Sequence, residues 1–573
     1  MPRKSAVRTA EAGIGLDLSC RAKDLGFAVA RAAPYLPVTL RSTYLICLDA
    51  FRRSGTVPLV AAAALSFTLA VAGTAADGWP LPRAFDEFSY LLAGETFASG
   101  RLSNPAYALP EAVQTIHVLQ QPTYASKYLP GHGLFLALGV ALGGSPRLGQ
   151  WLAFAVMGAA LYWMLSAWFS RRAAFLTTSL FILVLADTDW ASGYWGASEA
   201  VAGSALIFGA IGRLRHGPRI GLGLLAGLGA MLLALTRPLE GLAVSILPAA
   251  YLAWWVFGSG TERKPRLTRF ALPCALVLTL GMSFLAAHNK AVTGDPMRLP
   301  YAHYENGAVG APPFIWQAVN TPSGELRANE QARLRIDLGS YNGMRQDWLG
   351  SMWARASAQS LGFYLPHAAF ALVLFLLPLA WRRRSLWLVA ASATAVGIAI
   401  GTSSFYLPHY LAPALPPLLI LYTVSCGLAA RIKWSGHRVG RAAITGLTIT
   451  LAGFGVWRIF SHTPLEQAMT RPIYWTRQRE AIAQRIQAKP GKHVVFVRYA
   501  SSYKSQNEWV QNGADLARAD LLWVHDLGEP ANAALRQYEV ERSAWLVTVH
   551  GSSQPPELTP YDAPVRVLGA MAR

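Results

Sequence analysis

The chain contains a long succession of apolar segments, each close to the roughly 20 residues that a helix needs to cross a bilayer core. The first is Val57–Ala76. With 53% hydrophobic and only 14% charged residues, the composition is that of a membrane protein. The sequence therefore predicts an α-helical polytopic membrane protein with about 11 transmembrane helices. The other candidate segments are 147–168, 173–189, 197–212, 219–236, 239–257, 270–288, 362–381, 385–403, 409–430 and 441–460.

Positively charged residues between these segments predict the orientation of the chain. Lys and Arg concentrate in every second connection, whereas the short connections near 187–196 and 402–408 contain none. Because cytoplasmic loops are enriched in Lys and Arg, the N-terminus is predicted to be cytoplasmic and the C-terminus extracytoplasmic. This distribution explains the net charge of +20 without a nucleic-acid partner, since the charges do not cluster on one folded face. The basic connections are Arg171–Arg172, Arg213 to Arg219, Arg263 to Arg269, Arg382–Arg384 and Arg431 to Arg441.

Three regions follow from this topology. Residues 1–56 are basic and predicted to be cytoplasmic. They form either a helix at the membrane surface or a partly disordered tail, and the sequence favours neither. Residues 57–460 form the transmembrane domain, whose two long outer loops are 77–146 and 289–361. Residues 461–573 alternate between β-rich runs and helix-like stretches, which predicts a small extracytoplasmic α/β domain.

The first outer loop holds the residues best suited to chemistry. Asp86 and Glu87 lie beside aromatic residues directly after the first span, and His117 and Lys127 follow in the same loop. The apolar piece Leu134–Leu142 is too short to cross a bilayer and is typical of a half-helix or re-entrant element. The sequence thus predicts a site at the outer membrane surface.

Several short motifs, in this order, resemble those of the integral-membrane glycosyltransferases of the C type (GT-C), especially the branch of protein-O-mannosyltransferases and aminoarabinose transferases. Asp86–Glu87 stands where that family has an acidic motif, and KYLPGHGLFLALG (127–139) is similar to its element before a juxtamembrane helix. HNKAVTGDPMRLPY (288–301) resembles the opening of the second large loop in bacterial members. YLPHYLAPALPPL (406–418) resembles a His-Tyr motif followed by prolines.

The resemblance implies an enzyme of the bacterial inner (plasma) membrane. It would transfer a sugar from a polyprenyl-phosphate-linked donor to a lipid, glycan or protein acceptor on the extracytoplasmic face. Such a reaction needs a base for the acceptor and cations for the phosphate leaving group. The expected partners are this donor, the acceptor and membrane lipids.

The resemblance places the family's catalytic aspartate on Asp86, which is the predicted base. Glu87 is predicted to support it, to orient the acceptor or to help bind a metal. We expect Phe85 and Phe88 to bury Asp86 partly and to raise its pKa, as suits a base. The alternative is that both acids are solvated loop residues.

Two cations of the predicted outer side are the candidates for binding phosphate. Lys127 lies in the first loop, and Arg237 lies at the outer end of the fifth predicted span. For Arg237, an interfacial arginine paired with Glu240 is the alternative. Structural histidines and interfacial aromatic residues are the alternatives for the remaining binding candidates, which are His117, Tyr128, Tyr301, His303, His409 and Tyr410.

Three further acids are open to more than one interpretation. Asp187 and Asp189 form a D-x-D pattern, which binds a metal in other glycosyltransferases and equally suits a helix end. Glu199 lies near the outer end of the fourth span, where an acid is either functional or held by hydrogen bonds. The cofactor is unknown. A divalent metal stays open, because one or two carboxylates suffice for a hard cation.

The main alternative function is a transporter or flippase of a lipid-linked substrate. Such a protein is expected to carry ionisable residues near the middle of the bilayer and two related halves. Here the acids from Asp77 to Asp347, except Glu262, fall on the predicted outer side, and no half repeat is visible. A membrane scaffold whose C-terminal domain binds a partner would leave the acidic loop unexplained.

Overall fold

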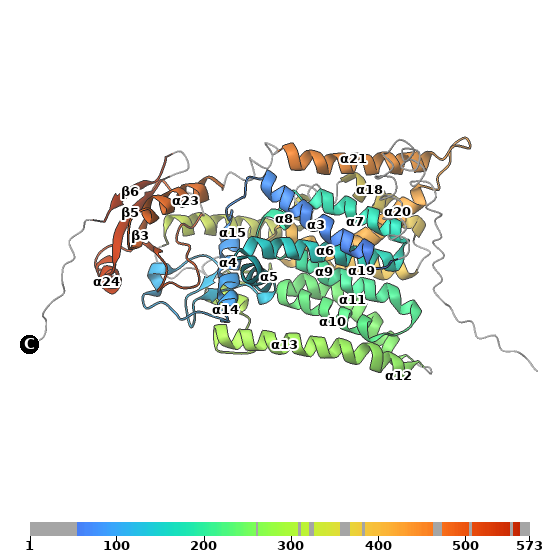
Figure 1. The fold of residues 1–573 in the computed structure, drawn as a ribbon, viewed down its shortest axis with the longest axis horizontal. Coiled ribbons are helices and arrows are strands. Elements are labelled where there is room, and N and C mark those ends of the chain that lie inside the picture. Colours follow the sequence, from blue (N-terminus) through green and yellow to red (C-terminus); the bar gives the residue numbers. More distant parts are fainter. Residues whose placement is uncertain are drawn as a thin grey trace, which may run out of the picture.

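The computed structural model describes residues 54–258, 262–307, 311–319, 326–355, 367–380, 384–461, 473–503, 507–550 and 554–561. Most of them form helices that lie side by side in an elongated bundle, and a small sheet lies at one end of the molecule (Figure 1). This is the predicted fold class. Of the basic segment 1–56, only residues 54–56 are described.

Eight helices within the described residues are long and apolar enough to cross a membrane. Each of them coincides with a span predicted from the sequence, and the chain is therefore built as a multi-pass membrane protein. They are α3 (Val57–Ala76), α6 (Pro146–Trp168), α9 (Ala197–Arg213) with the helical turn that extends it to His216, α11 (Pro238–Phe257), α13 (Leu272–Thr293) with the helical residues that precede it from Arg263, α19 (Arg384–Thr402), α20 (Leu415–Ala429) with the helical turns that precede it from Pro408, and α21 (Val439–Ser461).

The three other predicted spans are also helices, but they are shorter than 18 residues where they are described. They are α7 (Arg171–Leu185), α10 (Ile220–Thr236) and α18 (His367–Ala380). Residues 362–366 and 381, which belong to the third of these spans, lie outside the described residues. The count of eleven spans therefore stays a prediction.

The first outer loop folds into two helices and a short ribbon. Helix α4 (Phe85–Ala98) packs against α5 (Pro130–Gly143), and β1 (Val118–Leu119) pairs antiparallel with β2 (Ala125–Ser126) between them. Helix α5 has 14 residues, too few to span a bilayer, as predicted. Gly133 lets the two helices approach closely, because a Cβ atom there would lie 2.9 Å from Cβ of Ala93.

The second outer loop is also helical where it is described. It contains α14 (Pro300–Gly307), α15 (Ala328–Gln346) and the short α16 (Trp348–Ala354). Figure 1 shows α14 and α15 at the same end of the bundle as α4 and α5. The two long loops predicted on the outer side thus meet at one end of the molecule.

The C-terminal region forms a four-stranded sheet in the order β4-β3-β5-β6, in which only β6 runs antiparallel to its neighbour. Its elements are α23 (Ile473–Gln487), β3 (Lys492–Tyr499), β4 (Leu521–His525), α24 (Ala531–Tyr538), β5 (Arg542–Val549) and β6 (Glu557–Pro560). The alternating pattern predicted from the sequence is confirmed. The domain boundary at residue 461 stays a prediction, because residues 462–472 lie outside the described residues.

The sheet packs directly on the first outer loop. Val494, Phe496 and Leu522 share one hydrophobic cluster with Val113 and Tyr124 of that loop. This contact fixes the C-terminal domain at the end of the bundle where both long loops lie.

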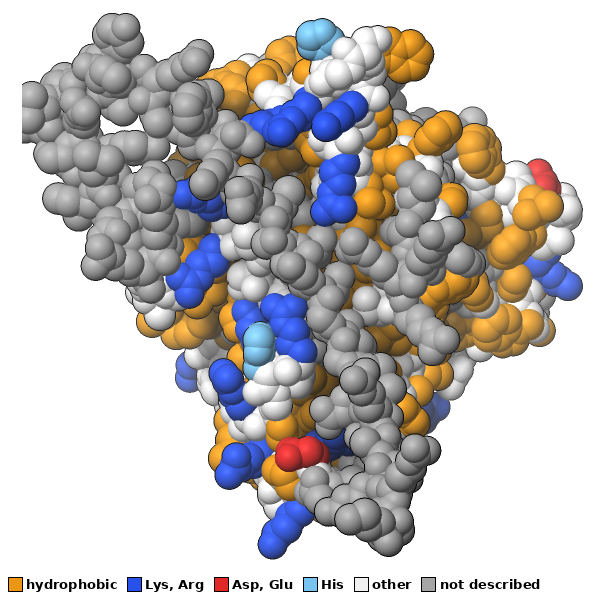
Figure 2. All heavy atoms as spheres, turned by 90° about the vertical axis from the view of Figure 1, so that its right-hand side faces the viewer, with side chains coloured by type: hydrophobic (Ala, Val, Ile, Leu, Met, Phe, Trp, Pro, Cys, Tyr) orange, Lys and Arg blue, Asp and Glu red, His pale blue; other side chains and the backbone are white. Residues whose placement is uncertain are grey.

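Basic side chains gather at the opposite end of the bundle. Figure 2 looks onto this end and shows Lys and Arg side chains spread over it, with few Asp or Glu. Helix α7 begins here, α9 ends here, and α12 (Arg263–Arg266) and the turn between α20 and α21 lie here as well. An end rich in Lys and Arg is what a cytoplasmic face predicts.

Candidate active site

Asp86 is the second residue of α4 and lies in a closed group of three side chains. Its Oδ1 accepts a hydrogen bond from the Tyr128 hydroxyl and lies 3.1 Å from Nδ1 of His117. The Tyr128 hydroxyl lies 2.8 Å from the same His117 nitrogen. The side chain of Asp86 is 13% exposed and that of His117 is 9% exposed. The structure therefore brings three of the predicted site residues, Asp86, His117 and Tyr128, into direct contact.

The expected raised pKa of Asp86 is wrong. Burial does raise it, but the pKa lies below its ordinary value, because His117, Tyr128 and Lys127 together favour the carboxylate more strongly. Burial, with the positive charge of Lys127, lowers the pKa of His117 to about 4. At neutral pH the group is therefore an ionised Asp86 beside a neutral histidine.

The backbone of His117 is fixed by contacts on both sides. Its φ angle of 64° places it in the left-handed region, which histidine tolerates better than most residues. The Tyr304 hydroxyl lies 3.0 Å from its amide nitrogen and accepts the hydrogen bond. Its carbonyl accepts hydrogen bonds from the Ser89 hydroxyl at 2.6 Å and from the Lys127 amide at 3.1 Å. The imidazole is thus held in place before any substrate binds.

Glu87 faces away from this group and caps the helix. Its carboxylate accepts backbone hydrogen bonds from Arg83 at 2.5 Å, Ala84 at 3.1 Å and Tyr194 at 2.9 Å. These bonds fix the first turn of α4 and tie it to the segment before α9. They give Glu87 the means to hold Asp86 in position.

Lys127 is buried next to Asp86 but already has an acidic partner. Its Nζ lies 2.7 Å from Oε1 of Glu305 in α14, and it lies 4.6 Å from the ring centre of Tyr301 and 4.7 Å from that of Tyr304. The carboxylate and the two rings compensate much of its charge.

Arg237 is a buried cation with no carboxylate in an ion pair with it among the described residues. It lies between α10 and α11, is 9% exposed, and stacks over the Tyr410 ring at 4.8 Å. Among the described residues it forms no ion pair, with Glu240 or any other acid, and its Nε has no hydrogen-bond partner. Arg237 and Glu240 therefore form no direct ion pair in this structure, although each acts electrostatically on the other.

Aromatic residues connect Arg237 with Asp86. Tyr128, which bonds to Asp86, stacks on Tyr90 with ring centres 4.2 Å apart. Tyr90 and Tyr410 each interact electrostatically with both Asp86 and Arg237. The carboxylate and the guanidinium therefore face the same small group of side chains, although about 150 residues separate them in the sequence.

His409 belongs to the same group. It is buried, its ring lies 4.6 Å from Trp195, and both Asp86 and Arg237 act on it electrostatically. His303 does not reach Asp86 through any contact among the described residues, and its Nδ1 has no hydrogen-bond partner there. The structure thus gathers most of the predicted binding residues and leaves His303 apart.

Three site residues were not predicted from the sequence. Tyr304 and Glu305 of α14 contact His117 and Lys127, and Nη2 of Arg333 in α15 lies 3.4 Å from Nε2 of His117. Helical spacing could have found two of them, because residues 301, 304 and 305 share one helix face while 303 points elsewhere. No pattern in the sequence pointed to Arg333.

The remaining acidic candidates have basic partners. Asp187 pairs with Arg458 at 3.4 Å, and Asp189 pairs with Arg83 at 3.1 Å. Glu199 is fully buried and lies 2.8 Å from Nδ1 of His132. In the part of the chain that the structure describes, no three His, Cys, Asp or Glu side chains are grouped to hold a metal ion.

Comparisons with known proteins give structural similarity at low sequence identity. No protein-family model and no curated protein matches the chain. The chain is similar to ArnT from Cupriavidus metallidurans bound to undecaprenyl phosphate, with 14% identity and a TM-score of 0.45, over 86% of this chain and 92% of that one. It is also similar to the archaeal oligosaccharyltransferase AglB from Archaeoglobus fulgidus, in complex with an inhibitory peptide and a dolichol-phosphate. There the identity is 13% and the TM-score 0.43, over 86% of this chain and 69% of that one. Identity this low does not carry the activity of either protein over to this chain.

Proposed function

We propose that the chain is an integral membrane glycosyltransferase. It transfers a sugar from a polyprenyl-phosphate-linked donor to a lipid, glycan or protein acceptor on the extracytoplasmic face of a bacterial inner membrane. The observation that carries the proposal is the position of an ionised Asp86 and of an Arg237 that forms no ion pair among the described residues, around one group of buried aromatic side chains.

Asp86 is the proposed base. In the transfer, an acceptor hydroxyl or amine loses its proton to the Asp86 carboxylate as its oxygen or nitrogen attacks the anomeric carbon of the sugar. The bond between that carbon and the phosphate oxygen breaks, and the phosphate leaves with the electron pair. An acceptor that displaces the Tyr128 hydroxyl removes one interaction that lowers the pKa of Asp86, and so makes the carboxylate more basic where the proton is taken.

Arg237 is the proposed contact for the phosphate. Negative charge builds up on the phosphate oxygens as the bond breaks, and a buried guanidinium with no carboxylate partner stabilises it. Lys127 is a weaker candidate than the sequence suggested, because Glu305 already compensates its charge. We assign to Lys127 a supporting electrostatic role beside Asp86, together with Tyr301 and Tyr304.

The remaining candidates line the same space. His409 and Tyr410 lie beside one another, Tyr410 under the Arg237 guanidinium, and Asp86 and Arg237 act on both electrostatically; we propose that they line the space for the sugar and phosphate of the donor. We propose that the outer loops and the C-terminal domain are extracytoplasmic, since they lie at the end of the bundle opposite the basic residues. This places the site at the outer membrane surface.

The test compares the lipid-linked sugars, glycolipids and glycoproteins of wild-type cells with those of a deletion strain. The strain is then complemented with the wild type, Asp86→Asn or Glu111→Gln. Glu111 is an exposed acid of the same loop and serves as the matched control. We expect one glycoconjugate to disappear on deletion, and to return with the wild type and Glu111→Gln only. Full recovery with Asp86→Asn would remove Asp86 as the base, and unchanged glycoconjugates in the deletion strain would remove the proposed function.

A further inference from the structure

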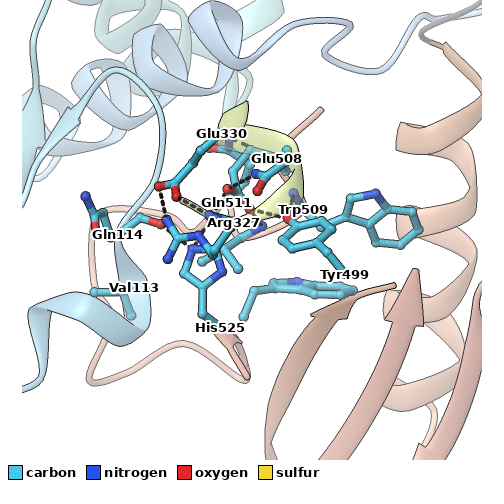
Figure 3. A network of polar contacts seen from close by, with 12 residues as sticks. Val113, Gln114, Arg327, Glu330, Tyr499, Glu508, Trp509, Gln511 and His525 are labelled. Carbon is cyan, nitrogen blue, oxygen red and sulfur yellow. Dashed lines mark hydrogen bonds and ion pairs between the residues drawn. The ribbon is translucent and has the colours of Figure 1, made fainter. Parts of the chain in front are cut away.

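A buried glutamate of the C-terminal domain holds the beginning of α15. Glu508 is 1% exposed and lies between β3 and β4. Its Oε1 accepts hydrogen bonds from the Val510 amide at 2.9 Å and from the Tyr499 hydroxyl, and its Oε2 accepts one from Nδ2 of Asn329 at 2.8 Å. Figure 3 shows Tyr499, Glu508 and Trp509 of the domain facing the start of α15. All three hydrogen bonds that Glu508 accepts come from groups of this chain, so its buried carboxylate is satisfied within the protein.

The first turn of α15 is held by this contact with Glu508. Asn329 is fully buried, and Glu330 closes the turn by accepting the Arg327 amide at 2.9 Å and pairing with its guanidinium at 2.5 Å. The first outer loop reaches the same place, because the Gln114 carbonyl lies 2.6 Å from Nε2 of His525 (Figure 3). Three segments that are distant in sequence are therefore fastened together here.

One helical turn further along, α15 reaches the candidate active site. Arg333 follows Asn329 by four residues, which places the two side chains on the same face of the helix. Its Nη2 lies 3.4 Å from Nε2 of His117, its Nη1 lies 3.4 Å from the Tyr304 hydroxyl, and its Nε lies 3.3 Å from Asp337. A shift or rotation of the first turn would move Arg333 away from His117.

We infer that Glu508 is a positioning residue: it holds Asn329 and thereby fixes the start of α15. The position of α15 in turn keeps the guanidinium of Arg333 next to His117, which contacts Asp86. The C-terminal domain thereby sets the geometry of the site from outside it. The inference rests on the proposed function insofar as His117 holds the proposed base. A buried acceptor bonded both to Asn329 of α15 and to Tyr499 and Val510 of its own domain supplies the required rigidity.

The charge on Arg333 gives this inference a readout that a purely structural role lacks. His117 faces Asp86 from α4, Lys127 and Tyr128 from its own loop, Tyr304 from α14 and Arg333 from α15. Arg333 is one of the groups that keep the pKa of His117 low. Its displacement raises that pKa, so the acid limb of the activity moves to higher pH.

The experiment uses the full chain in membranes of complemented deletion cells, which contain the native donor and acceptor. Transfer is measured against pH for Asn329→Ala, Glu508→Ala and Arg333→Gln, with Glu541→Ala as the control, because Glu541 is an exposed acid of the same domain. We expect the first three variants to lower transfer on the order of tenfold to a hundredfold. The acid limb should move to higher pH in all three and stay unchanged in the control.

A conservative variant separates hydrogen bonding from charge. Glu508→Gln keeps Oε1 as an acceptor, and when the Asn329 amide turns over, the glutamine NH2 donates to Oδ1 of Asn329, which has no partner among the described residues. We expect this variant to restore transfer and the pH profile. An unshifted acid limb in Asn329→Ala and Glu508→Ala, with folded protein present, would overturn the inference.

A second measurement does not depend on the proposed function. Hydrogen exchange of the purified protein in detergent should be faster across residues 328–346 in Asn329→Ala and Glu508→Ala than in Glu541→Ala. Equal exchange in all three variants would overturn the positioning role, even if the activity proves to be of another kind. Faster exchange with no glycoconjugate lost on deletion would uphold the role of Glu508 and reject only the proposed function.

Discussion

Asp86 and His117 are in direct contact across the first outer loop, with Oδ1 of the carboxylate 3.1 Å from Nδ1 of the imidazole. Because both atoms also contact the Tyr128 hydroxyl, the carboxylate, the imidazole and the phenol depend on one another. Each protonation change in this group alters the other two members. The pH dependence of the protein therefore reports on the site directly.

Transfer should stay nearly constant from neutral pH down to about pH 5 and fall as the pH approaches the His117 pKa of about 4. Above that pH His117 is neutral, and below it a positive His117 binds the Asp86 carboxylate and hinders proton transfer. The measurement is the initial rate of glycoconjugate formation in membranes at constant ionic strength. A loss of activity already between pH 7 and 6, near the ordinary histidine pKa, would contradict the burial of His117.

Arg237→Met should abolish transfer while leaving the protein as stable as the wild type, or more stable. The reason is that Arg237 is a buried charge that forms no ion pair among the described residues, so its removal breaks no salt bridge. Arg458→Met is the matched control, because Arg458 is equally buried but pairs with Asp187. Thermal unfolding in detergent should show a loss of stability only for Arg458→Met, and a destabilised Arg237→Met would count against the assignment.

Glu305→Gln should destabilise the protein by about 3 kcal/mol, because it leaves Lys127 buried without a carboxylate. Lys127→Met combined with Glu305→Leu removes both charges and should recover most of that loss. Burial raises the pKa of Glu305, but Lys127 lowers it further, to below its ordinary value. The wild-type pair therefore stabilises the protein above the ordinary glutamate pKa, and this contribution is lost as the pH falls.

Thermal unfolding at pH 7 and pH 4 measures both parts of the Glu305 prediction. The melting temperature of the wild type should fall more on acidification than that of the double variant. An equal fall in both proteins would show that the pair contributes nothing to the pH dependence.

Glu87→Gln should lower stability by about 1 to 2 kcal/mol and reduce transfer without abolishing it. An amide offers one acceptor oxygen, whereas the Glu87 carboxylate accepts bonds from amides on both of its oxygens. Melting temperature and transfer rate are measured together with those of Asp86→Asn. Complete loss of transfer in Glu87→Gln, at unchanged stability, would instead indicate direct participation in catalysis.

The sequence was most informative for features that depend on residues close together in the chain. Apolar length located the membrane helices, and the alternating charge separated the two ends of the bundle, because both properties are carried by consecutive residues. The α/β pattern after residue 473 was equally readable. Helices α7 and α10 match predicted spans but are short, so the number of crossings depends on tilt and lipid thickness, which no sequence pattern states.

The site was predictable only in part. Asp86 stood out by its place in the order of motifs, and Lys127 and Arg237 by the short motifs that contain them. The lowered pKa of Asp86 was not foreseen, since it depends on His117 and Tyr128, which the fold of the loop brings to it from 31 and 42 residues away. The pairing of Lys127 with Glu305 and the position of Arg333 next to His117 depend on how the second outer loop packs on the first. Such contacts between distant segments leave no local signature.

The central claim is that Asp86 takes the proton and Arg237 holds the phosphate. The most direct test measures binding of undecaprenyl phosphate to the purified protein by native mass spectrometry, alongside transfer in membranes, for the wild type, Asp86→Asn and Arg237→Met. The account predicts that Asp86→Asn binds undecaprenyl phosphate as the wild type does but transfers no sugar, whereas Arg237→Met loses both. Normal transfer by Asp86→Asn, or unimpaired binding by Arg237→Met, would contradict it.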